Sequence, residues 1–211
     1  MVSNRSDTVK IGILFFVALI FNIIASGISD PIIGNPDYLS LVYPNKTVVI
    51  TANVLNLICA VAMIFIPIVL IRVAKKEYQS LAVVYLVFRF LEGILFIYLA
   101  IKSLSIISLS SNYLSAGNNS SAAISILGNS VKSEIEWATN IYILVFCFGA
   151  SAFYTLLYKS KLVSRILSVW GIIAVVFLFI GAVMGLFGIG LFNDLPLMKG
   201  MVYFAPPIAL N

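Results

Sequence analysis

The sequence predicts an all-α protein, a polytopic helical membrane bundle. Of its 211 residues, 62% are hydrophobic and 10% are charged, whereas about 25% of the residues of an average soluble domain are charged. Several apolar segments are also long enough to cross a hydrocarbon core of about 30 Å as helices. This composition excludes a water-soluble globule, and we expect residues 1–211 to form a single transmembrane helical domain.

Five apolar segments of about 20 residues follow one another along the chain. They are Ile11–Ser29, Val48–Ile71, Leu81–Ile101, Trp137–Tyr158 and Ile166–Ile189. A sixth begins near Met201, and the roughly 11 residues from there to Asn211 are about half of the length that a crossing requires. We therefore expect five complete transmembrane helices plus a truncated sixth. An alternative interpretation of the first segment, a signal peptide cleaved after small residues near Ala25, stays open.

The connections between the segments carry their own signals. Asn35-Pro36-Asp37 supplies an N-cap, a first-turn proline and an acid, which predicts a short helix that runs to Tyr43. The serine-rich stretch Lys102–Lys132 predicts a solvated loop, with a short interfacial helix from residue 120 to 128. Ser133 and Glu136 have the spacing of a capping box at the start of the fourth segment.

The cations at the segment ends predict the orientation. With the N-terminus inside, eight cations lie on the cytoplasmic side and four on the outer side, as the positive-inside rule requires. The eight are Arg5, Lys10, Arg72, Lys75, Lys76, Lys159, Lys161 and Arg165, and the four are Lys46, Lys102, Lys132 and Lys199. Because the net charge of +5 is spread over the segment ends, we expect membrane lipid and no nucleic acid as a partner.

Arg89 and Glu92 stand near the middle of the third segment. A charge at the centre of a membrane helix costs about 2.5–3.5 kcal/mol on insertion scales, so such a residue indicates a functional site with a partner. At a spacing of three residues the two side chains share one helix face and can pair. The five donors of arginine suit a carboxylate or phosphate, whereas glutamate can accept a proton or a cation.

Four asparagines extend this pair into a candidate polar layer. They are Asn22 in the first segment, Asn53 and Asn56 in the second and Asn140 in the fourth. Counting from the segment ends places Asn22 and Asn56 at the depth of the pair and the other two nearer the outer surface. We therefore predict a ligand-binding centre of these six residues. The competing interpretation is that the polar groups satisfy one another and fix helix register.

The fifth segment carries a glycine ridge, Gly181, Gly185 and Gly188. Small residues at this spacing let another helix approach closely. The ridge therefore predicts helix packing, and homo-oligomer formation through the face of Gly181 and Gly185 is a further hypothesis. A hinge is the alternative.

Several catalytic and cofactor classes are excluded by the residues that the sequence lacks. Without histidine, there is no bis-histidine haem site, histidine zinc site or serine–histidine pair. No phosphate-binding glycine loop is found. Cys59 and Cys147 lie at mid-membrane depth and are expected to pack as small apolar side chains. We therefore predict no catalytic residues, no metal and no cofactor.

Separated segments of the chain carry a family resemblance. They are Asp37-Tyr38-Leu39, Phe88-Arg89-Phe-Leu-Glu92, Leu157-Tyr158-Lys-Ser-Lys-Leu-Val163, Leu167-Ser-Val-Trp-Gly171 and Pro207-Ile-Ala-Leu-Asn211. Through them, nearly the whole chain resembles a family of small bacterial multi-span membrane proteins known only as domain of unknown function 4386. The resemblance implies an architecture and no activity. In that family the last motif leads into an acidic residue and a further apolar run, which agrees with a truncated sixth helix.

These observations predict a multi-pass protein of the bacterial cytoplasmic (plasma) membrane with a cytoplasmic N-terminus. We expect it to bind or translocate a small ligand or ion at the midplane polar cluster around Arg89 and Glu92. A structural or partner-binding membrane subunit with a purely structural Arg–Glu pair is the alternative, and an atypical membrane enzyme comes third.

Overall fold

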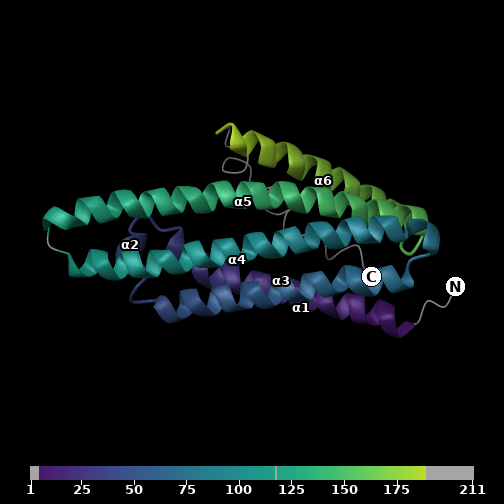
Figure 1. Cartoon of the computed structure of the whole chain (residues 1–211), viewed down its shortest axis with the longest axis horizontal. Helices are drawn as coiled ribbons and strands as arrows, with labels where there is room; N and C mark the ends of the chain where they lie inside the picture. The colour runs from purple at the N-terminus through teal and green to yellow at the C-terminus, as the bar shows by residue number, and fades with distance from the viewer. Residues whose placement is uncertain (1–4, 117, 189–211) are drawn as a thin grey trace.

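The computed structural model describes residues 5–116 and 118–188, which are helical apart from short turns (Figure 1). The helices are α1 (Arg5–Ile33), α2 (Tyr38–Leu41), α3 (Lys46–Val73), a short 3-10 helix η1 (Lys76–Tyr78), α4 (Gln79–Ser115), α5 (Asn118–Ser160) and α6 (Arg165–Leu186). No strand occurs within these ranges, so the all-α prediction is confirmed.

Five of the helices, α1, α3, α4, α5 and α6, are long and apolar enough to cross a membrane. α1, α3, α4 and α5 each contain one of the predicted apolar segments, and α6 contains the fifth as far as Leu186, which confirms five long apolar helices. Large apolar side chains such as Phe16, Phe65 and Phe90 are more than half exposed, as expected for surfaces that face lipid. The end of the fifth segment at Ile189 and the expected sixth helix lie outside the described residues.

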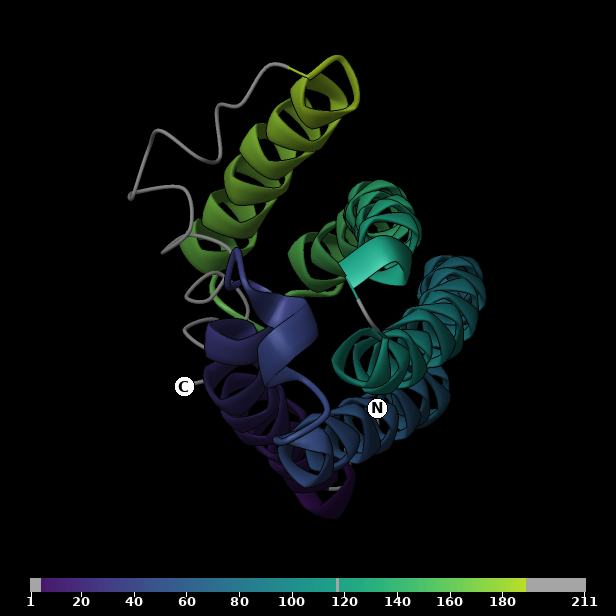
Figure 2. The same ribbon diagram turned by 90° about the vertical axis from the view of Figure 1, so that its left-hand side faces the viewer.

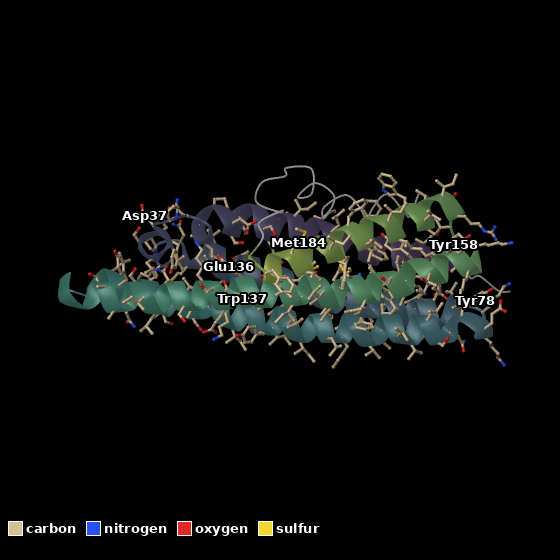
Figure 3. The ribbon with its side chains drawn as sticks, turned by 90° about the horizontal axis from the view of Figure 1, so that it is seen from above. Asp37, Tyr78, Glu136, Trp137, Tyr158 and Met184 are labelled. Carbon is tan, nitrogen blue, oxygen red and sulfur yellow. The ribbon has the colours of Figure 1, made fainter. Side chains whose placement is uncertain are left out.

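Successive long helices pack against each other in chain order. α1 lies on α3, α3 on α4, α4 on α5 and α5 on α6, and Figure 2 shows them following one another around an arc. Short turns make each neighbour antiparallel. The bundle thus has two ends, seen in Figure 3 with Asp37 at one and Tyr78 and Tyr158 at the other. We call the first, with residues 34–45, the end of α4 and the start of α5, the α2 end, and the second, with residues 74–78 and 161–164, the opposite end.

The prediction of a loop between residues 102 and 132 is wrong. α4 continues to Ser115 and α5 starts at Asn118, so these two helices form one long hairpin. At ~1.5 Å per residue, the 43 residues of α5 span ~64 Å, about twice a hydrocarbon core. The hairpin therefore projects past α6 at the α2 end (Figure 1). No proline interrupts it, and serines such as Ser105 and Ser115 donate to carbonyls one turn earlier in their own helix.

The long hairpin also corrects the capping prediction. Ser133 and Glu136 lie inside α5, so neither starts a helix. Glu134 beside them instead forms an ion pair with Lys102 of α4, and Tyr98 donates a weak hydrogen bond of 3.4 Å to the same carboxylate oxygen. This exposed pair links the two helices of the hairpin at the α2 side of the spans.

A small apolar core joins the short helix α2 to the hairpin. Tyr38, Leu39 and Val42 are buried against α3 and α4. The hydroxyl of Ser110, fully buried, donates to the Leu39 carbonyl oxygen at 2.6 Å and accepts from the Tyr43 backbone N–H at 2.8 Å. A short helix here was predicted to reach Tyr43, and α2 ends two residues earlier, at Leu41.

Candidate functional site

The centre of the candidate site is the ion pair on α4. Arg89 Nη1 donates to Glu92 Oε2 at 2.6 Å, and both side chains are buried, with 5% and 3% of their surfaces exposed. Both residues belong to the same helix, one turn apart, so local helical geometry alone brings them together. Charge-assisted hydrogen bonds of this length are among the strong ones in proteins. The predicted pairing is thus present, away from lipid.

Aromatic side chains cover the guanidinium. Arg89 Nε donates to the Tyr85 hydroxyl at 2.9 Å, and Tyr85 is fully buried one turn earlier in α4. The Arg89 guanidinium carbon lies 5.0 Å from the ring centre of Tyr85 and 5.2 Å from that of Phe146 on α5. Such contacts stabilise a desolvated cation by about 2 kcal/mol or more. Arg89 is therefore held by its own helix and by one ring of α5.

Glu92 is less completely satisfied. Its Oε2 accepts from Arg89, but its buried Oε1 accepts no hydrogen bond from the residues that the structure describes. Gly149 of α5 stands beside this atom, where an added Cβ would lie 3.3 Å from Oε1 and 2.9 Å from Phe88 Cβ. Any larger residue would force α4 and α5 apart. The glycine thus allows close helix approach and leaves the free oxygen of Glu92 facing backbone.

Other titratable side chains surround the pair. Tyr142 of α5 lies within electrostatic range of Glu92, Arg89 and Cys59, and its ring packs against Phe96 with 5.1 Å between ring centres. Cys59 of α3 and Cys147 of α5 are buried free thiols. The site therefore draws side chains from α3, α4 and α5.

The structure spreads the predicted polar layer along the bundle axis. Asn53 donates through Nδ2 to the Ser103 hydroxyl of α4 at 3.0 Å, whereas Gly93, next to Glu92, faces Ile64 of α3. Because α3 and α4 are antiparallel, Asn53 lies about 16 Å nearer the α2 end than Glu92. Asn56 lies one turn closer, ~12 Å from the level of Glu92. The second segment thus supplies polar groups that lie nearer the α2 end than the Arg89–Glu92 pair.

The remaining two asparagines also lie apart from the ion pair. Asn22 is half-buried on the α1 stripe of Ala18 and Ala25 that packs on α3, near the level of Asn56. Asn140 points toward α6, where an added Cβ on Gly185 would meet its Oδ1 at 2.9 Å. Among the described residues, no hydrogen bond joins either side chain to Arg89 or Glu92. The structure therefore brings together two of the six predicted residues.

The glycine ridge of α6 is used within the chain. Gly181 is buried and Gly185 contacts Asn140 of α5, so this face packs on α5. Gly188 has a left-handed backbone with φ of 72° and open space around it, which is the usual role of glycine after a helix end. Homo-oligomer formation through the ridge stays a prediction, and Gly185 already has an intramolecular neighbour.

The described residues were also compared with the side-chain clusters that bind metal ions. Within residues 5–116 and 118–188, no three histidine, cysteine or acidic side chains lie together as a possible metal site. The polar groups of the centre are a guanidinium, a carboxylate, two phenols and two thiols. This donor set can bind a proton, a cation or a hydrogen-bonding ligand.

The fold and the site together define a multi-pass helical membrane protein with a buried ion pair in its third span. A family model described as Domain of unknown function (DUF4386) matches residues 11–210. The chain belongs to this family, as the resemblance of its separated motifs implied. Neither the curated proteins nor the solved structures provide a match.

Four residues of the centre escaped the sequence prediction: Tyr85, Tyr142, Phe146 and Gly149. Tyr85 lies four residues before Arg89, and that spacing places both on one helix face, so the signal was available. Gly149 gave no such signal, because glycine within an apolar segment is typical of any close helix contact. Its place beside Glu92 depends on the register between α4 and α5.

Proposed function

We propose that this protein binds a small ligand or ion at Glu92, as a binding or transport protein of the membrane. The observation that carries the proposal is the buried Oε1 of Glu92, which has no partner among the described residues. A buried acceptor left unsatisfied costs about 1–3 kcal/mol. A bound hydrogen-bond donor or cation removes that cost.

The charge of Arg89 and the close approach of Gly149 favour a small ligand at Glu92. Arg89 already neutralises one carboxylate oxygen, and Gly149 lies close to the other. A proton is the smallest occupant that satisfies Oε1, and an ammonium group or a sodium ion has the same preference for oxygen acceptors. These three are therefore the ligand classes that we would test first.

For the location we propose the bacterial cytoplasmic membrane with the N-terminus in the cytoplasm. The support is the charge distribution, with eight cations on the N-terminal side of the membrane and four on the other. On this topology the opposite end of the bundle faces the cytoplasm and the α2 end faces outward.

A structural or partner-binding subunit is the second candidate function. In its favour, Arg89 is covered by Tyr85 and Phe146, as expected of a self-contained pair. Against it, both charges belong to α4, so the pair does not tie two helices together. An enzyme is the third candidate, and no observed arrangement of residues favours it.

Infrared difference spectroscopy on purified protein in lipid vesicles tests Glu92 directly. Between acid and alkaline pH we expect a protonated-carboxyl band that disappears in Glu92→Gln and persists in Glu134→Gln. Thermal-shift measurements with sodium chloride and ammonium chloride, using choline chloride at equal ionic strength as reference, extend the test to cations. The proposal fails if the band is insensitive to Glu92→Gln and the Arg89→Met/Glu92→Leu double variant keeps every cation-induced shift.

A further inference from the structure

The two ends of the bundle differ in charge. Toward the α2 end, the three described cations Lys46, Lys102 and Lys132 stand among four acids, Asp30, Asp37, Glu134 and Glu136. The two turns of the opposite end and the helix ends beside them carry six cations and one acid, Glu77. These six are Arg72, Lys75 and Lys76 at the first turn and Lys159, Lys161 and Arg165 at the second.

The fold places these two turns side by side. The 3-10 helix η1 of the first turn contacts α5, and Tyr78 of the first turn packs on the same core cluster as Leu162 and Val163 of the second. Figure 3 shows Tyr78 and Tyr158 at this same end of the bundle. Cations that are far apart in the chain therefore share one surface.

The six cations are exposed and almost unneutralised. Lys75 lies 3.9 Å from Glu77, with both side chains at least half exposed. The other five form no ion pair with the residues that the structure describes. On α1 at the same end, Lys10 is already paired with Asp7 at 2.8 Å. This surface thus presents positive charge that the described part of the chain does not neutralise.

The surface lies at the expected level of the lipid headgroups. Arg72 directly follows the apolar segment that ends at Ile71, and Lys159 directly follows the segment that ends at Tyr158. The guanidinium carbon of Arg165 lies 5.5 Å from the ring centre of Tyr158, and tyrosine is typical of the membrane–water interface. The negative charges available at that level are those of anionic lipids.

We propose that the opposite end of the bundle binds anionic phospholipids, with their phosphates held between the cations of the two turns. Clusters of about four to eight lysines and arginines next to a membrane span are typical of such binding. Orienting a span requires cations only in the connections, whereas adjacent turns also allow one headgroup to contact cations of both. This surface is separate from Glu92, and its lipid binding does not depend on what Glu92 binds.

Electron paramagnetic resonance of spin-labelled lipids tests the proposal on the purified protein in phosphatidylcholine vesicles. The motionally restricted fractions of labelled phosphatidylglycerol and labelled phosphatidylcholine give the relative association of the anionic lipid. We expect a preference of about threefold or more for phosphatidylglycerol at low salt, which falls as sodium chloride is added.

Two triple variants with the same change in charge locate the preference. Neutralising three cations of the two turns should remove most of it, and the variant is Lys76→Gln/Lys161→Gln/Arg165→Gln. Neutralising three cations toward the α2 end should leave it intact, and this control is Lys46→Gln/Lys102→Gln/Lys132→Gln. Equal losses in the two variants would overturn the proposal.

Two single variants keep the test independent of folding defects. Lys161 has a left-handed backbone with φ of 55°, so Lys161→Gly removes a cation without backbone strain and should lower the preference. Glu77→Gln removes the acid of the two turns and should raise the preference, which a folding defect would not do. The proposal is also overturned if the wild-type protein shows no preference or if Glu77→Gln fails to raise it.

Free phosphate is the other source of the same chemistry. Sodium phosphate should reduce the preference no more than sodium chloride at equal ionic strength, because we expect the headgroup to bind as part of the membrane surface. A stronger reduction by phosphate would indicate a site for the free anion and count against lipid as the ligand.

Discussion

Two ion pairs that involve α4 differ in almost every respect. Arg89 and Glu92 are one turn apart in α4, with 5% and 3% of their side chains exposed. Lys102 of α4 and Glu134 of α5 come from different helices, with 26% and 43% exposed. The first pair is enclosed by aromatic rings, and the second has access to solvent.

Burial decides which of the two pairs is informative about function. A solvent-accessible pair is screened by salt and contributes little to stability, so its presence needs no functional explanation. A buried pair has lost its hydration, and breaking it leaves an unpaired buried charge. Substitutions along α4 and its neighbours should therefore differ strongly in their cost.

Removing one partner of the buried pair should cost the most. Arg89→Met leaves the Glu92 charge buried without a counter-ion, so we expect a loss of about 3–5 kcal/mol in the free energy of unfolding. The Arg89→Met/Glu92→Leu double variant should recover much of it. Unfolding in denaturant, in a constant lipid or detergent environment, measures both. The expectation is contradicted if the double variant loses as much stability as the Arg89→Met and Glu92→Leu single variants lose together.

Closing the space beside Glu92 should come second. In Gly149→Ala the new methyl group would meet Phe88 Cβ at 2.9 Å, so α4 and α5 must separate, at a cost of about 1–3 kcal/mol. The matched control is Gly27→Ala in α1, where an added Cβ meets nothing within 4 Å. Thermal unfolding of both variants decides, and equal melting temperatures would show that α4 and α5 adjust freely.

At the α2 end, Ser110→Ala should have an intermediate effect. It removes the bonds to the Leu39 carbonyl and the Tyr43 N–H, which together contribute about 1–3 kcal/mol. Hydrogen exchange should accelerate in residues 38–43 and remain unchanged around Glu92. The control is Ser105→Ala, since Ser105 is only partly buried and its hydroxyl bonds the Ile101 carbonyl of its own helix.

The exposed pair should respond least. Glu134→Gln should shift the melting temperature only slightly, and raising the salt concentration should abolish the difference from wild type, because the pair is screened. A loss as large as that of Arg89→Met would erase the contrast between the two pairs.

The sequence predicted the five spans and the Arg–Glu pairing because both depend on local properties. Apolar length sets each span, and a spacing of three residues sets the pairing. It failed at residues 102–132, where serine, glycine and asparagine suggested a loop although α4 and α5 continue through most of that stretch. Serine hydroxyls that bond their own helix make such a composition compatible with helix.

The asparagines show the limit of counting from segment ends. That count placed Asn56 level with Arg89 and Glu92, whereas the packing of Gly93 on Ile64 and of Asn53 on Ser103 puts it nearer the α2 end. Helix ends differ from the ends of the apolar runs by several residues, and ~1.5 Å per residue converts that into much of the observed offset. Register between helices comes from side-chain packing, which composition does not encode.

Hydropathy and residue spacing were enough to establish the membrane class, the five spans and the presence of a charged pair that lipid would penalise. Packing between helices settled which α5 residues meet that pair and that Gly149 lies beside the second oxygen of Glu92. The physical reason is range: hydropathy and helical spacing act within one helix, whereas the environment of a buried charge depends on contacts between helices that are distant in the chain.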